Sequence, residues 1–373
     1  MQQALTLAPE LRLQQISQAR RAVLGEGRSP AGTLSASWIE RSWQRCLSRG
    51  QEPERDITFE VVSKHAARRS QDAHGGLMQA ARPVLEKLGR AIADTRYFAI
   101  LTDAQGVVVD MSGPIDRSDR RADLITRVGT DLSERSVGTS AIGAALSELH
   151  SVWLHRGEHF FATTSVYSCA GAPLFGPDGH CVGMLDLTGI EAVERPELAH
   201  LAAQSARRIE NALLRERPHS LLLHLNWPGH TLGFDADGLV CLDADGLVVG
   251  ANQIARQMVS SLASPNAAAL HISDIFGVPY QMLFDAARRQ SPVIEVPLWS
   301  GLRLNALALA RSHEVDAGGG GFRTSEQAPL RDVETALIRK AVDDARGNVA
   351  QAARLLGISR ATVYRKLGNG KRL

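Results

Sequence analysis

Features that place a protein in a membrane or outside the cell are missing from this sequence of 373 residues. It has no run of eighteen consecutive apolar residues, so no membrane-spanning helix is expected. Its first fifteen residues lack a basic segment followed by an apolar one, so we expect no secretory signal. The four cysteines are scattered, without CxxC spacing, which favours reduced thiols and a cytoplasmic protein.

Motifs for nucleotide hydrolysis and nucleophilic catalysis are missing too. No G-x-x-x-x-G-K-[S/T] segment occurs, and such a segment supplies the backbone N–H groups and the lysine that hold phosphates. Ser168 lies in YSCAG, which is not a G-x-S-x-G turn. No nucleophile, base and orienting group can be assembled around Glu134 or Asp186. We therefore expect a protein that is not an enzyme, in which Glu134 braces the loop before a helix.

The charge of the chain is balanced overall but concentrated at one end. The composition, 44% hydrophobic and 22% charged, is ordinary for globular protein, and the length favours two to four domains. A net charge of +2 argues against a general polyanion binder. Residues 331–373, however, contain ten Lys/Arg and four Asp/Glu. A basic end of this kind is the electrostatic footprint of a DNA-binding module.

Residues 348–367, NVAQAARLLGISRATVYRKL, have the pattern of a helix-turn-helix. We expect a helix at 349–356, a turn at Gly357, where a glycine suits positive φ, and a second helix at 360–367 capped by Ser359.

The second helix of this pair would place basic and hydroxyl-bearing side chains away from the core. Val363 and Leu367, four residues apart, share a face and are expected to pack on Ala353. Such a unit reads base edges by laying its second helix in the major groove of double-stranded DNA. The predicted DNA-binding residues are Ser359, Arg360, Ala361, Thr362, Tyr364, Arg365 and Lys366.

The rest of the sequence predicts a multidomain α+β protein. Residues 1–75 are expected to be helical, and Trp38 and Trp43 lie on an amphipathic stretch that favours packing against another element or subunit. Residues 76–216 alternate strand and turn patterns, as in an α+β sensor with antiparallel strands and helices on one side. This module would end in a helix at 196–215, expected to pair in a dimer.

A third module at residues 230–311 repeats the strand–turn–strand theme around Asp-Gly turns and has the element order of a PAS-type fold. Residues 312–329 include four consecutive glycines with polar neighbours and are expected to be a flexible linker. Residues 330–373 would form the all-α DNA-binding domain.

Several segments together resemble the AcoR/DhaR-type bacterial enhancer-binding regulators: SWIERSWQRC, LTDAQG, SERSVGTSAIGAAL, GEHF, YSCAGAPLFGPDGHCVGMLDLTG and GNVAQAARLLGISRATVYRKL. The resemblance covers roughly residues 35–215 and 328–367. It implies a GAF sensor, a PAS domain and a Fis-type DNA-binding domain. In that family a sigma-54-interacting AAA+ ATPase lies before the Fis-type domain. Here the glycine-rich segment occupies that place, and no GAFTGA-like loop occurs.

The resemblance implies regulation by binding. Without an ATPase such a protein would repress, recruit RNA polymerase of another sigma type, or compete with a full-length relative. We expect a homodimer, since two-fold DNA sites match two-fold proteins. The alternative is an interaction module that forms heterodimers with an ATPase-bearing relative and modulates it.

GAF folds hold small ligands between the sheet and the loops, so the resemblance also implies an effector site. Family members respond to acetoin, alcohols, glycerol-type compounds or ketones, which implies a small organic effector. The wall would be mostly apolar with a few hydroxyls. Each wall residue, taken singly, is also compatible with an ordinary core position. The predicted wall residues are Phe98, Ile100, Val137, Thr139, Phe160, Tyr167, Cys169 and Leu185.

A metal or redox sensor is the alternative to an organic effector. His155 and His159 lie four apart, and Cys169, His180 and Cys181 follow, so iron or zinc ligation is conceivable. Residues 155–158 have a turn pattern, however, so the two histidines would not share a helical face. A haem on His271 is the corresponding alternative for the third module. We expect neither a metal nor a haem cofactor.

Overall fold

The computed structural model describes residues 9–27, 37–59, 63–263, 270–289 and 293–310, together with Val349, Gln351, Ala353, Arg360 and Val363. The chain divides into two compact units, Met1–Arg311 and Ser312–Leu373. No helix in the described part of the chain is both long enough and apolar enough to span a bilayer.

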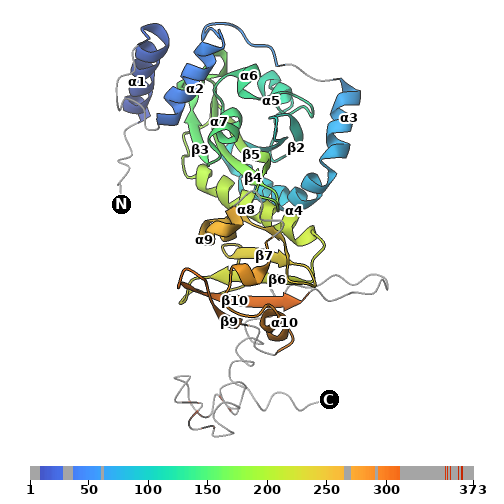
Figure 1. Ribbon diagram of the computed structural model, residues 1–373. Helices are drawn as coiled ribbons and strands as arrows, with labels where there is room; N and C mark the ends of the chain where they lie inside the picture. Colours follow the sequence, from blue (N-terminus) through green and yellow to red (C-terminus); the bar gives the residue numbers. More distant parts are fainter. Residues whose placement is uncertain are drawn as a thin grey trace. The chain divides into compact units, whose positions relative to one another are not determined.

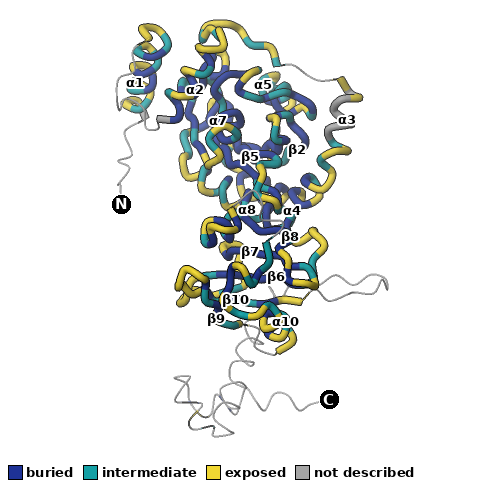
Figure 2. Tube along the Cα trace, in the orientation of Figure 1, coloured by how far each residue is buried: buried dark blue, intermediate teal, exposed yellow. Residues whose placement is uncertain are grey.

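The first unit contains two sheets. The first of these is five-stranded and antiparallel, with the strand order β2-β1-β5-β4-β3 (Figure 1). Its strands are β1 (Tyr97–Asp103), β2 (Val108–Ser112), β3 (Val152–His155), β4 (Tyr167–Phe175) and β5 (Cys181–Ile190). The strands expected at 97–102 and 107–111, and the pair around the Pro-Asp-Gly turn, are confirmed. Nearly every strand residue is buried (Figure 2), so both faces of the sheet are covered.

Helices cover both faces of this sheet, so the expectation of helices on one side is wrong. Helices α4 (Gly75–Ala91) and α8 (Leu198–Glu216) pack on one face through a core that includes Leu85, Leu187 and Ile209. The opposite face is covered by a second core, to which α2 and α7 contribute. The helices on or near this opposite face are α1 (Pro9–Arg20), α2 (Ser37–Ser48), α5 (Arg120–Ile125), α6 (Glu134–Val137) and α7 (Ala141–Glu148).

The N-terminal region contributes to the core on the α7-covered face of the first sheet. Trp38 is 7% exposed and Trp43 is fully buried, and both belong to the core that also contains Phe160. The prediction that these tryptophans pack against another element is confirmed. The remaining helical pieces before and within the first sheet are Arg21–Gly25, α3 (Lys64–Ala73), Ala93–Thr95, Arg156–Glu158 and Ala162–Thr164.

A second antiparallel sheet follows, in the order β8-β7-β6-β10-β9. The expected strands and helices after residue 230 are present, but the central strand β6 precedes that boundary. The sheet therefore begins earlier than the sequence pattern indicated. Its elements are β6 (Leu221–Asn226), β7 (Gly238–Leu242), β8 (Val248–Ala251), α9 (Gln253–Met258), Ser260–Ala263, Ile272–Asp274, α10 (Gln281–Ala287), β9 (Val293–Pro297) and β10 (Arg303–Ala310).

Buried hydrogen bonds tie α8 to the second sheet. Asn252 caps α9 by accepting from the Ala255 N–H at 2.9 Å, and its side-chain amide donates to Asn211 Oδ1 on α8, also at 2.9 Å. The Arg256 guanidinium donates to the Pro177 carbonyl oxygen at 2.7 Å. The two sheets of the first unit are thus joined by specific polar contacts.

In the second unit, the described residues Val349, Gln351, Ala353, Arg360 and Val363 are helical. Ala353 and Val363 are buried, whereas Arg360 is exposed. This is the inward and outward arrangement expected for the two helices. The expected linker at 312–329 lies outside the described residues.

Candidate ligand-binding site

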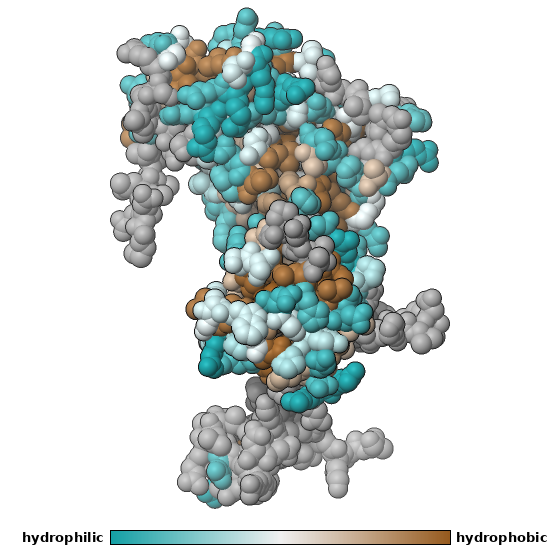
Figure 3. All heavy atoms as spheres, viewed as in Figure 1, coloured by the Kyte–Doolittle hydropathy of each residue, from teal (hydrophilic) through white to brown (hydrophobic). Residues whose placement is uncertain are grey.

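A cavity of about 40 Å³ lies against the α7-covered face of the first sheet. Such a volume accommodates about three water-sized positions. In the space-filling view, hydrophobic residues gather near the middle of one face of this unit, bordered by hydrophilic ones (Figure 3). The cavity is lined by Phe59, Ile100, Ile125, Leu132, Val137, Ser140, Ala141, Ile142, His159, Thr164, Tyr167, Cys169, Asp186 and Thr188.

Half of the predicted wall residues line this cavity: Ile100, Val137, Tyr167 and Cys169. Phe98 and Phe160 are buried in the surrounding core without lining it. Thr139 turns towards α2, where its hydroxyl lies 2.7 Å from that of Ser42. Leu185 points to the opposite face of the sheet, because successive residues of a strand alternate between faces.

His159 was not among the predicted wall residues, yet it lines the cavity and carries an unpaired hydrogen-bond acceptor. Its Nδ1 lies 2.9 Å from the Arg156 carbonyl oxygen, which can only accept, so Nδ1 carries the proton. Burial lowers the pKa of His159 to about 4, which keeps the ring neutral. Nε2 therefore has a free lone pair and no hydrogen-bond partner among the described residues.

Asp186 is the second polar group that the predicted wall omitted. Its Oδ2 accepts from the Thr188 hydroxyl, and the Thr188 oxygen lies 3.4 Å from Cys169 Sγ. Its Oδ1 is buried and has no partner in the described part of the chain. Burial raises the pKa of Asp186 to about 7, so near neutral pH the carboxyl can either donate or accept.

Two of the histidines considered for metal or haem binding have protein partners. His155 Nδ1 lies 2.9 Å from the Ser168 hydroxyl. His271 Nε2 lies 2.9 Å from the Asp245 carbonyl oxygen. Within the described ranges, no three His, Cys, Asp or Glu residues form a group able to hold a metal ion.

The loop that carries His159 is held by α1. Arg20 donates to the carbonyl oxygens of Gly157 at 3.2 Å, His159 at 2.5 Å and Phe160 at 2.7 Å. The Trp43 indole N–H donates to the Glu158 carbonyl oxygen at 2.9 Å. These contacts fix the backbone on both sides of the histidine.

Buried Glu158 adds a charge pair to the same loop. Its carboxylate accepts from Arg12 of α1 and from the His155 backbone N–H, at 2.8 and 2.7 Å. Burial raises the pKa of Glu158 to about 7, against the opposing effect of Arg12. The first N-terminal helix is therefore part of the structure that positions His159.

Replacing Arg20 by methionine is expected to lower the free energy of unfolding by about 2 kcal/mol, because three partly buried carbonyl oxygens lose a charged donor. Urea denaturation followed by circular dichroism measures this change. The matched control is Arg21→Met, at an exposed neighbouring position, which should leave stability unchanged. Equal stabilities of the two variants would contradict the role of Arg20.

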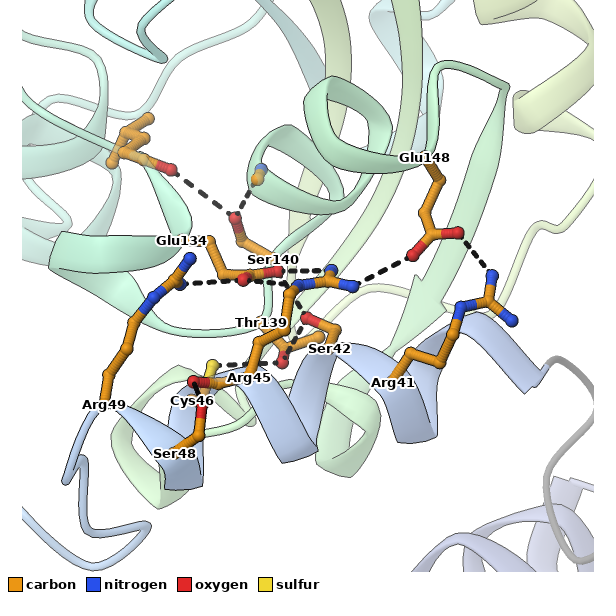
Figure 4. A network of polar contacts seen from close by, with 12 residues as sticks. Arg41, Ser42, Arg45, Cys46, Ser48, Arg49, Glu134, Thr139, Ser140 and Glu148 are labelled. Carbon is orange, nitrogen blue, oxygen red and sulfur yellow. Dashed lines mark hydrogen bonds and ion pairs between the residues drawn. The ribbon is translucent and has the colours of Figure 1, made fainter.

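The loop before α7 is held by α2 through Glu134 (Figure 4). Its carboxylate accepts from Arg45 at 2.9 and 2.7 Å, from Arg49 at 2.9 Å and from the Ser42 hydroxyl at 2.7 Å. Burial alone would raise the pKa of Glu134, but the hydrogen bonds from Arg45 and Ser42 outweigh it, and the pKa is lowered. The expectation that Glu134 braces this loop agrees with these contacts.

Two glycines permit this close packing. Gly138 has φ 65°, and a Cβ there would lie 2.9 Å from side-chain atoms of Phe160 and Phe161. A Cβ on Gly143 would lie 2.7 Å from the Glu134 Cβ. Glycine at position 138 lets the chain after α6 pass close to Phe160 and Phe161, and glycine at position 143 lets α7 pack closely against Glu134 of α6.

Of the predicted DNA-binding residues, Arg360 is described and is exposed on a helix. The others, Ser359, Ala361, Thr362, Tyr364, Arg365 and Lys366, lie outside the described residues. Their contact with DNA stays a prediction.

Comparison with known proteins identifies both units. Residues 14–211 match the family described as "MimR, N-terminal domain", and residues 329–369 match "Bacterial regulatory protein, Fis family". The chain is 33% identical over 259 residues to the acetoin catabolism regulatory protein of Cupriavidus necator, covering 66% of this chain and 37% of that protein.

Two further comparisons concern a second relative and a solved structure. The chain is 30% identical over 180 residues to the propane 2-monooxygenase operon transcriptional activator MimR of Mycolicibacterium smegmatis, covering 48% of this chain and 30% of that one. The E. coli DhaR(N)–DhaL complex matches with a TM-score of 0.46 and 14% identity, covering 73% of this chain and 99% of that one. The chain spans about a third of the length of these two curated relatives.

Proposed function

The chain belongs to the MimR- and AcoR-type transcriptional regulators, and from this we propose that it binds specific double-stranded DNA sequences under the control of a small organic effector. The observation that carries the proposal is a cavity with unpaired polar groups on a chain that also matches a Fis-type helix-turn-helix. The cavity would bind the effector, and the helix-turn-helix would bind DNA.

We assign the first sheet to a GAF-type sensor within residues 76–216 and the second to a PAS-type domain. Both sheets are antiparallel and five-stranded, with helices inserted between the early and late strands. This supports the assignment. The PAS-type domain would include β6 and would therefore begin near residue 221 rather than 230.

The effector proposed for the cavity is small and oxygenated. The names of the relatives point to acetoin catabolism and to propane oxidation, which are both chemistry of short carbon chains. The mostly apolar lining of the cavity, with a few polar groups, suits a molecule of that kind.

We propose that the chain regulates without hydrolysing ATP. No phosphate-binding G-x-x-x-x-G-K-[S/T] segment occurs in its 373 residues. It would act by repression, by recruiting RNA polymerase, or by competing with a longer relative.

A homodimer is proposed to match a two-fold DNA site. The apolar residues of α8, including Ala202, Ala206 and Ile209, are buried within their own unit, so this helix does not present them to a partner as expected. The other expected pairing segment, residues 333–342, lies outside the described residues. DNA binding by the purified chain alone would favour a homodimer, whereas binding only in the presence of an ATPase-bearing relative would favour a heterodimer.

Replacing Arg360 or Arg365 by alanine is expected to weaken binding to the chain's selected DNA site by about 10- to 100-fold, because each side chain would contact base or phosphate. Fluorescence anisotropy with a labelled duplex measures this, and an unchanged melting curve shows that the fold persists. The matched control, Arg288→Ala, removes the same charge from an exposed position of the first unit. Affinity equal to wild type in both test variants would reject the proposed interface.

A further inference from the structure

Two of the residues that line this cavity each carry a buried polar atom without a partner. Across the described ranges, four buried side-chain nitrogen or oxygen atoms are without a hydrogen bond, and these include His159 Nε2 and Asp186 Oδ1. His159 is 2% exposed and Asp186 is 1% exposed. An unpaired buried polar atom is costly and rare, so two in one cavity indicate that a ligand completes them.

The other hydroxyl groups that line the cavity already have protein partners. The Tyr167 hydroxyl donates to the Arg121 carbonyl oxygen at 3.4 Å, and that of Thr164 donates to the Phe161 carbonyl oxygen at 2.9 Å. Ser140 caps α7 by accepting from the Gly143 N–H. A ligand is therefore recognised mainly through His159 and Asp186.

The ligand atom that meets His159 must carry a hydrogen. Because Nδ1 donates to the Arg156 carbonyl oxygen in a neutral ring, Nε2 can only accept. A hydroxyl satisfies this nitrogen, and a ketone oxygen, itself an acceptor, does not. Binding a ketone there would leave two acceptors facing each other.

Charge in the cavity favours a neutral ligand. None of the described residues that line it is a lysine or an arginine, so an anionic ligand would be buried without a counter-charge. An ammonium ligand would bring a second charge into an apolar cavity opposite Asp186, where desolvation opposes the pairing. A neutral hydroxyl can instead pair with the Asp186 carboxyl in either protonation state, because it both donates and accepts.

We propose that His159 and Asp186 make this cavity selective for a short neutral alcohol over the ketone of the same carbon skeleton. The ligand hydroxyl donates to His159 Nε2, and a second oxygen, where present, meets Asp186 Oδ1. The chain thereby distinguishes two oxidation levels of one metabolite. This inference rests on the proposed function, because the cavity is the proposed effector site.

Isothermal titration calorimetry on the full chain tests the inference with 2,3-butanediol, acetoin, 2-butanone and 2-butylamine. The expected result is that the two hydroxyl-bearing compounds bind at least about tenfold more tightly than 2-butanone and 2-butylamine. Equal or tighter binding of 2-butanone or 2-butylamine would overturn the inference, as would failure of both hydroxyl-bearing compounds to bind at millimolar concentrations.

Two variants test the histidine itself. His159→Phe removes the acceptor and should reduce the alcohol-to-ketone ratio to near one, whereas His159→Gln keeps an acceptor and should restore part of the preference. A preference retained in the phenylalanine variant would overturn the assignment to His159. If a variant does not fold, the wild-type ligand series still decides. Alcohol binding that leaves DNA affinity unchanged would reject the proposed effector control and leave the selectivity intact.

Discussion

Replacing Glu134 by glutamine is expected to lower the free energy of unfolding of the first unit by about 3 kcal/mol. The carboxylate is 6% exposed and accepts from Arg45, Arg49 and Ser42. Removing one charge of a buried ion pair leaves the opposite charge buried without a partner, which costs about 3–5 kcal/mol. The expected loss lies at the lower end because the two arginines are partly exposed. Chemical denaturation followed by circular dichroism measures it.

Glu148→Gln is the matched control for Glu134. Its carboxylate also pairs with two arginines, Arg41 and Arg45, but the Arg41 side chain is 52% exposed. Ion pairs of this kind contribute about 1 kcal/mol or less. Losses of similar size in the two variants would contradict a special role for Glu134.

Replacing Asp186 by asparagine is expected to change how stability depends on pH. Folding raises the pKa of Asp186 from 3.8 to about 7, so the folded state binds this proton more tightly than the unfolded state does. The stabilisation is complete below pH 3.8 and is lost as pH rises through about 7. Between these two pH values, the free energy of unfolding of wild type should therefore fall by up to about 4 kcal/mol relative to that of Asp186→Asn.

Urea denaturation of both proteins at several pH values from 4 to about 8 measures this difference. Glu158 and Glu210 have pKa values raised in the same way, so the difference between variant and wild type is informative and the absolute stability is not. Asp285→Asn, at a site with a 56% exposed side chain, is the control for the substitution itself. A constant difference between wild type and Asp186→Asn would show that the carboxyl does not titrate in this range.

The strands of both sheets were largely predictable from local sequence. Asp-Gly and Pro-Asp-Gly turns flanked by β-branched runs encode hairpins without reference to distant residues. Strand β6 was missed because LLLHLN is a short apolar run whose position at the centre of a sheet depends on pairing with β7 and β10.

Four of the eight wall residues predicted from the sequence line the cavity. Strand β5 is buried on both faces, so hydrophobicity did not indicate that Leu185 and Asp186 point in opposite directions. His159 attracted notice as a metal ligand because of its spacing from His155. Its role as an acceptor depends on the hydrogen bond that Nδ1 makes to Arg156, which only the folded loop determines.

The contact between α2 and the Glu134 loop was not predictable as a pairing. Ser42, Arg45 and Arg49 lie at positions i, i+3 and i+7, so the sequence shows that they share a helix face. That this face meets Glu134, about ninety residues away, is a tertiary fact. Two of the six segments that carry the resemblance to the regulator family thus meet in space.

The central claim is that effector binding to the first unit changes sequence-specific DNA binding by the second unit. Selection of DNA sequences by the intact chain tests this most directly. Purified protein would be incubated with a library of random duplexes, and the affinity for the enriched sequence would be measured with and without acetoin. The expected result is a single two-fold symmetric sequence whose affinity changes when acetoin is bound. Enrichment of no sequence over random duplex would contradict a DNA-reading role for residues 348–367.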